Sequence, residues 1–277
     1  NQKLEIYGDR ISMRSVNTDE TLGTAITGNE GRLDLVANES LDIVGGIYGY
    51  NEVYGGKSNL IFNINQNEGS TAKTTIVGDI DAAKGSEVNI GLKGTGSSIT
   101  GNMLVSAEGT TLPGGLINLQ FGDEGTITGN ITAQDEGVIK ITAGDDFNIN
   151  GNLLATTAGS SIDIQGSDVE IESVNGGLWA ENYAKININA NKAGEIEISS
   201  IDGEAVKAYN NGQVNIGSAD VESVEISSVT NNAIYTAYRG AFADKKNSVT
   251  NITGKNISIS TKADELGAIH VASKTLD

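Results

Sequence analysis

Cys, His and Arg, which supply nucleophiles, general bases and anion-binding groups in many enzymes, are scarce in this 277-residue chain. The chain contains no Cys, one His (His270) and four Arg, and its central part has neither Arg nor His. A single His270 in the last repeat, in a chain with no Cys and no G-x-S-x-G sequence, does not indicate a catalytic triad with a general base for Ser. The 36 Asp and Glu residues could form a glycosidase pair, ~5–9.5 Å apart, but such pairs arise by chance in so acidic a chain. We therefore expect a binding or structural protein, with a polysaccharide-processing lyase or glycosidase as the alternative.

Five carboxylates recur at nearly the same offset after short apolar segments: Asp9, Asp123, Asp145, Asp168 and Asp220. Stacked carboxylates could share a Ca²⁺ ion, which accepts six to eight oxygen ligands. Asp at turns usually hydrogen-bonds its own backbone instead, and the calcium-binding repeat GGxGxDx does not occur here. We expect structural turns and no cofactor, with Ca²⁺ as the alternative.

The charge of the chain limits its partners. Asp and Glu outnumber Lys and Arg by 36 to 18, which gives a net charge of −18 at pH 7. This charge is spread along the chain and repels phosphate backbones, so nucleic acid is not an expected partner. No run of 18 apolar residues occurs, so we expect no direct membrane insertion.

A short segment of alternating apolar residues recurs about ten times along the whole chain. Successive equivalent positions lie 22 to 29 residues apart, and the last step is 36 residues. These positions are Ile6, Leu35, Ile64, Ile90, Leu119, Ile141, Ile164, Ile188, Ile216 and Ile252. A period of this length, built from strands, is typical of a solenoid.

The elements expected from this pattern are two or three short strands per repeat, each ending at Gly, Asn, Asp or Ser. Aromatic residues make up 5% of the chain, which is too few for a large globular core but enough for a thin row of Ile, Val and Leu. Equivalent strands should stack in parallel, ~4.8 Å apart. We expect one all-β domain over residues 1–277, cut from a longer repetitive protein.

Two recurring sequences make the pattern more specific. They are I-x-G-N-I-x-A, as in 127–133, and a longer variant that begins I-x-S-[IV], as in ISSIDGEAVKA at 198–208. These sequences resemble the repeats of the right-handed parallel β-helix passenger domains of Gram-negative autotransporters. The resemblance implies a β-helix of about ten coils, displayed at the bacterial cell surface. It also implies adhesion to host or bacterial surface glycans or proteins, or to copies of itself. An inert stalk is a further alternative.

One outward-facing row is expected to carry a binding site. Each repeat contains two apolar alternations, and in the second of them two inward residues flank an outward one. The outward residues of successive repeats are Thr27, Tyr48, Asp81, Leu104, Thr132, Leu154, Trp179, Lys207, Tyr235 and His270. Trp179 and His270 are the only Trp and His of the chain. Tyr209 and Tyr238 follow a few residues later. Such rings can bind sugars or apolar side chains, or can simply cover the sheet.

Two other segments are candidate contact surfaces. Residues 45–56, GGIYGYNEVYGG, place Tyr48, Tyr50 and Tyr54 between glycines, as in an adaptable contact loop or in a corner packed against its own coil. The segment 239–248 interrupts the period and carries Arg239, Lys245 and Lys246. Insertions in repeat proteins often lie on the binding face, although a solvated loop has the same composition.

Overall fold

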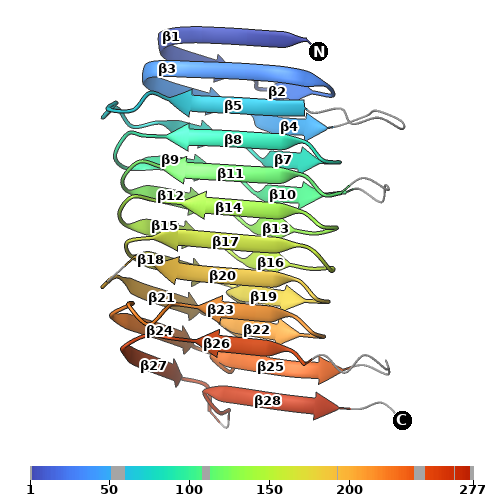
Figure 1. Ribbon diagram of the computed structural model, residues 1–277, viewed down its shortest axis with the longest axis vertical. Helices are drawn as coiled ribbons and strands as arrows, with labels where there is room; N and C mark the ends of the chain where they lie inside the picture. The colour runs from blue at the N-terminus through green and yellow to red at the C-terminus, as the bar shows by residue number, and fades with distance from the viewer. Residues whose placement is uncertain are drawn as a thin grey trace.

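The computed structural model describes residues 2–50, 60–107, 113–191, 193–239, 247–264 and 266–274. Within these ranges the protein is all-β and has no α-helix. The strands stack into a rod, with β1 (Lys3–Arg14) at one end and β28 (Ile269–Lys274) at the other (Figure 1). No helix capable of crossing a membrane occurs in the described ranges.

The rod has three lateral faces, which we name A, B and C. Face A begins with the N-terminal parts of β1 and β3 (Gly31–Val44). It continues with β5 (Leu60–Gln66), β8 (Glu87–Leu92), β11 (Leu116–Phe121), β14 (Val138–Thr142), β17 (Ser161–Gly166), β20 (Lys185–Ala190), β23 (Gln213–Ile216) and β26 (Val249–Ile252). Each strand pairs in parallel with the equivalent strand of the next repeat.

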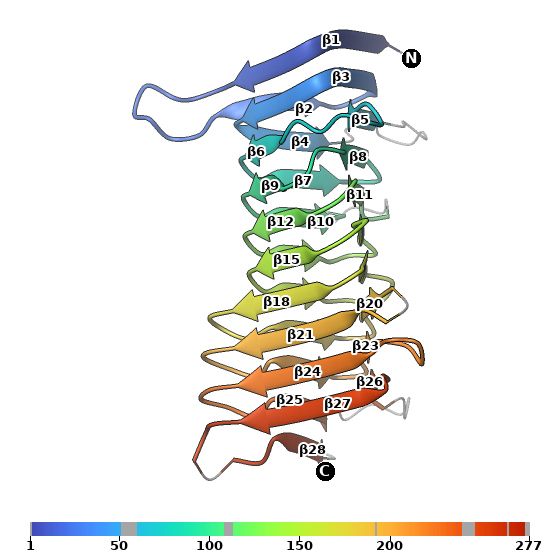
Figure 2. The ribbon, with the colours of Figure 1, turned by 90° about the vertical axis from the view of Figure 1, so that its left-hand side faces the viewer.

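Face B begins with the C-terminal parts of β1 and β3, which join faces A and B in one 18-stranded sheet. Its other strands are β6 (Thr75–Val77), β9 (Ser97–Thr100), β12 (Gly125–Thr128), β15 (Phe147–Asn150), β18 (Val169–Ser173), β21 (Glu195–Ser200), β24 (Ser223–Ser228) and β27 (Asn256–Thr261). Figure 2 shows this face, again with parallel neighbours.

Face C is a separate parallel sheet of ten strands. They are β2 (Thr24–Gly28), β4 (Gly46–Tyr50), β7 (Ile80–Ala83), β10 (Met103–Ser106), β13 (Ile131–Ala133), β16 (Leu153–Ala155), β19 (Leu178–Glu181), β22 (Val206–Tyr209), β25 (Ile234–Arg239) and β28. Each coil thus passes through faces A, B and C in turn. These repeated parallel strands are consistent with a parallel β-helix or β-solenoid.

The core follows from the alternation of the sequence. The row predicted to be equivalent, from Ile6 to Ile252, is paired in register through all ten coils. Its middle members are buried: Ile141 is 1% exposed and Ile164 is 3% exposed. Burying one such side chain contributes about 1.5–3 kcal/mol. The predicted register is therefore confirmed for this row.

Glycine is required at the corner between faces B and C in the earlier coils. Gly78, Gly101 and Gly129 have φ values of +145°, +151° and +146°. A Cβ atom on Gly101 would lie 2.2 Å from the carbonyl oxygen of Gly78 in the preceding coil. The corner therefore excludes any side chain at this position, which explains the recurring Gly of I-x-G-N-I-x-A.

Candidate binding surface

The predicted outward row of face C is confirmed as a continuous row of register neighbours. Trp179 pairs with Lys207, Lys207 with Tyr235, and Tyr235 with His270, on β19, β22, β25 and β28. The earlier members lie in the same row, from Thr27 through to Leu154. We call Trp179, Lys207, Tyr235 and His270 the face C stripe.

Side chains of the face C stripe contact one another along the rod. Lys207 Nζ lies 4.0 Å from the ring centroid of Trp179 and 5.8 Å from that of Tyr235. The rings of Tyr235 and His270 stack with centroids 5.2 Å apart and planes at 12°. The indole of Trp179 remains 40% exposed. The stripe therefore presents aromatic surface and one ammonium group to solvent, a combination that suits sugar rings or a peptide.

The two neighbouring tyrosines do not form a second row. Tyr209 is half-buried beside the stripe, with its ring centroid 5.9 Å from Lys207 Nζ. Its register partner on β25 is Ala237, whereas Tyr238 pairs with Ser273. Tyr209 thus lies beside the stripe residue of its own strand, Lys207, and Tyr238 is not in register with Tyr209.

The expectation of a tyrosine loop at residues 45–56 is wrong for its first part. Tyr48 and Tyr50 belong to strand β4. Lys84 Nζ lies 3.8 Å from the Tyr50 ring centroid and donates a hydrogen bond to its hydroxyl. Burial, reinforced by the carboxylate of Asp81, raises the pKa of Tyr48. Tyr54 lies outside the described residues.

Glycines in this segment serve packing. A Cβ atom on Gly46 would lie 2.4 Å from the ring of Tyr48, and one on Gly49 would lie 3.0 Å from Ser86 Oγ. Gly46 and Gly49 therefore permit the close approach of a ring and of the next coil, whereas Gly45, with a φ of +126°, forms the corner between β3 and β4.

The interrupting segment 239–248 falls largely outside the described residues, which include neither Lys245 nor Lys246. Arg239 is the last residue of β25. The structure resumes at residue 247, and Ser248 Oγ donates a hydrogen bond to the carbonyl of Ala237 at 2.7 Å.

Three of the five recurring corner carboxylates accept hydrogen bonds from the adjacent coil. Asn38 Nδ2 donates to Asp9 at 2.9 Å, and Thr95 Oγ1 donates to Asp123 at 2.9 Å. The backbone N–H of Glu195 donates to Asp168 at 2.7 Å. In the described part of the chain, no group of three or more His, Asp or Glu side chains is placed to hold a metal ion.

Sequence reasoning missed an acidic hollow of about 250 Å³ on face B. Its ionisable lining is Asp146, Asp168, Glu170, Glu195 and Glu197. Burial, with the charges of Glu170 and Glu225 adding to it, raises the pKa of Glu197. The signal in the sequence was the repeated E-I-E and E-I-S of three successive coils, which puts glutamates in one outward row.

Comparison of this chain with protein-family models, with curated proteins and with solved structures gave no match.

Proposed function

We propose that the chain is a right-handed parallel β-helix from the passenger domain of a Gram-negative autotransporter, displayed at the bacterial cell surface as an adhesin. The observation that carries this proposal is the face C stripe. It places the only Trp and the only His of the chain in one outward row with Lys207 and Tyr235. Aromatic residues make up 5% of the chain, so chance alone does not explain their alignment in one row.

The stripe supports adhesion through a lateral surface. Four adjacent coils at ~4.8 Å per coil place its ends about 14 Å apart, the length of a short extended saccharide or peptide. Aromatic rings supply stacking surface, and Lys207 supplies a charge for an anionic group within an acidic protein. The partner is therefore a host or bacterial surface glycan or protein, or a second copy of this chain.

Binding and catalysis can be separated in one experiment. The purified chain is incubated with anionic polysaccharides with and without Ca²⁺, and released reducing ends and unsaturated sugars are measured. In parallel, its binding to a glycan array and to cells is recorded. An adhesin binds and releases no product, whereas product release would establish the polysaccharide-processing alternative and contradict our proposal.

Self-association has its own test. Two rods of charge −18 repel each other unless salt screens them, with a Debye length of ~8 Å at physiological ionic strength. Homotypic contact should therefore strengthen with NaCl or Ca²⁺ in analytical ultracentrifugation. A strict monomer at every salt concentration would leave only a different molecule as the partner.

A further inference from the structure

The corner between faces B and C changes form halfway along the rod. Two residues separate β6 from β7, and the same number separates β9 from β10, β12 from β13 and β15 from β16. Four residues separate β18 from β19, and five separate β21 from β22 and β24 from β25. From β18 onward this corner extends further from the rod axis (Figure 2). The change coincides with the switch from I-x-G-N-I-x-A to the sequence with S-[IV].

Serine has a structural role in the longer corners. Ser173, Ser200 and Ser228 are buried. Gly176 N–H donates to Ser200 Oγ at 3.0 Å, and Ser228 Oγ donates to the carbonyl of Gly203 at 2.9 Å. These bonds hold each corner to the adjacent coil and explain why Ser recurs.

The aliphatic side chain after each Ser points into solvent instead. Val174, Ile201 and Val229 are 58%, 52% and 41% exposed. Backbone hydrogen bonds from Ile201 to Ser173 and from Val229 to Ser200, both 3.0 Å, place the three on adjacent coils. Single exposed apolar residues are common, but a repeated, aligned row of them indicates a contact surface.

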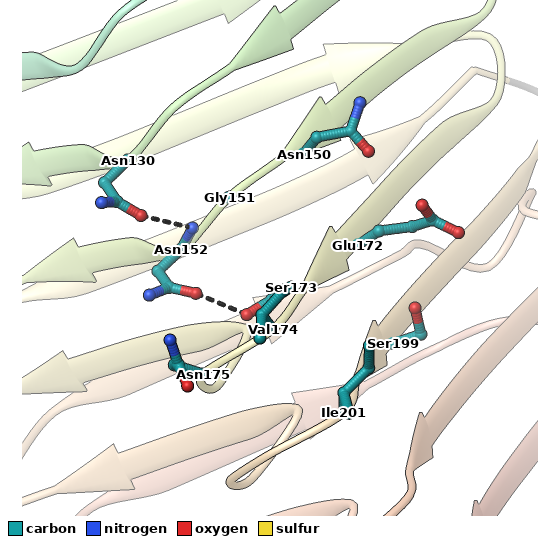
Figure 3. Close-up of a pocket in the computed structure, with 10 residues that line it drawn as sticks. All are labelled: Asn130, Asn150, Gly151, Asn152, Glu172, Ser173, Val174, Asn175, Ser199 and Ile201. Atoms are coloured by element: carbon teal, nitrogen blue, oxygen red, sulfur yellow. Dashed lines mark hydrogen bonds between the residues drawn. The ribbon is translucent and has the colours of Figure 1, made fainter.

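A pocket of about 390 Å³ lies where the short and long corners meet (Figure 3). Val174 and Ile201 form its apolar side, and Glu172 and Ser199 also line it. Asn130 Oδ1 accepts the backbone N–H of Asn152 at 3.1 Å, which fixes the opposite wall. The pocket therefore offers an apolar side beside a carboxylate.

Negative charge continues from this pocket across face B. Glu170, Glu197 and Glu225 are direct register neighbours on β18, β21 and β24. Within the described residues, none of the three forms a salt bridge with Lys or Arg. Like charges directly opposite each other in a sheet are destabilising. A cationic partner would relieve this repulsion.

We propose that this corner surface, made of Val174, Ile201 and Val229 with the glutamates of face B, docks a basic protein segment that carries apolar side chains. Along β18, Glu170 and Glu172 lie two residues apart, ~6.6 Å at ~3.3 Å per residue, and Val174 follows at the corner. An extended segment with two basic residues and then an apolar one, at every second position, matches this order. The glutamates of this surface lie on face B and its aliphatic residues at the corner, whereas the stripe lies on face C, so the two surfaces should bind independently.

Labelled peptides test this proposal by fluorescence polarisation. The probe is Lys-Ser-Lys-Ser-Leu-Ser-Leu, and the comparison peptides replace both Leu by Ser or both Lys by Glu. Wild-type protein should bind the probe more tightly than either comparison peptide. The double variant Val174→Ser/Ile201→Ser should weaken binding about tenfold through the lost apolar contacts.

Matched variants separate docking from general charge attraction. Glu197→Gln should weaken binding of the probe, whereas Glu30→Gln, with the same loss of charge at an exposed site in an early coil, should not. Trp179→Ala, on face C, should also leave binding unchanged. Far-ultraviolet circular dichroism verifies folding of each variant. Equal affinity of the double variant and wild type, or equal affinity for the probe and the peptide without Leu, would overturn the proposal.

Discussion

The ammonium group of Lys207 lies 4.0 Å from the ring centroid of Trp179, on the next coil of the rod. This contact links two residues 28 positions apart in the sequence because their strands are register neighbours. The contact leaves Trp179 40% exposed.

A double-mutant cycle should detect this contact. Trp179→Ala and Lys207→Gln each remove one partner, and the double variant removes both. We expect a coupling of about 0.5–1 kcal/mol in the free energy of unfolding, measured in urea. Effects that add within about 0.3 kcal/mol would show that the two side chains do not interact in solution.

A charged substitution in the core should lower the free energy of unfolding by more than the loss of this contact does. Ile164 is 3% exposed and lies in register between Ile141 and Ile188. Ile164→Asp places a charge in the narrow core and should cost at least about 3 kcal/mol, with loss of protease resistance. The outward neighbour Asp163 serves as control, since Asp163→Asn should change stability by less than about 1 kcal/mol. An Ile164→Asp protein as protease-resistant as wild type would contradict the assigned register.

Asp34 should make the N-terminal coils sensitive to acid. A hydrogen bond from Asn63 Nδ2, aided by Arg32 and Lys3, lowers the pKa of Asp34 to about 2. Because this folded-state pKa lies below the unfolded value, the stabilisation is present above about pH 4 and disappears as the pH falls towards 2. Asp34→Asn should be less stable than wild type at pH 7, and the difference should shrink at pH 2. A constant difference across this range, in urea unfolding, would refute the assignment.

The ionised carboxylate of Glu197 should destabilise the fold, whereas that of Asp34 stabilises it. Its pKa is raised by burial and by Glu170 and Glu225, so the folded state holds the proton more tightly than the unfolded state. The charged form therefore destabilises the fold at pH 7, and stability should increase as the pH falls through the raised pKa. Glu197→Gln should raise the melting temperature at pH 7, and this gain should vanish in acid. The control Glu30→Gln should not melt higher, and a lower melting temperature for Glu197→Gln would contradict the argument.

The rows along the rod were predictable from the sequence, whereas the corners were not. A strand alternates strictly, so Ile164 and Trp179 could be assigned to the inside and the outside, and the repeat then aligned them with Ile188 and Lys207. Which side chains meet around a corner depends on its length and on positive φ values. The pocket beside Val174 therefore became visible only in three dimensions.

The hydrogen bonds between asparagines along face A were also not predicted from the sequence. Asn89 Nδ2 donates to Asn63 at 2.9 Å, and Asn118 Nδ2 donates to Asn89 at 2.7 Å along face A. The sequence contains the signal, a recurring Asn one residue before an inward apolar position. Its meaning depends on direct register between outward residues, which links each amide to the next coil and leaves part of its hydrogen-bonding capacity facing solvent.

Fluorescence of Trp179, the only Trp of the chain, tests adhesion through the face C stripe most directly. A ligand selected on the glycan array is titrated into wild type, Thr132→Ala and Tyr235→Ala, and Trp179→Ala is compared on the array itself. We predict a saturable change in emission with equal Kd for wild type and Thr132→Ala, about tenfold weaker binding by Tyr235→Ala, and none by Trp179→Ala. Equal binding by all four folded proteins, or binding that leaves the emission of Trp179 unchanged, would contradict the assignment of the stripe as the adhesive surface.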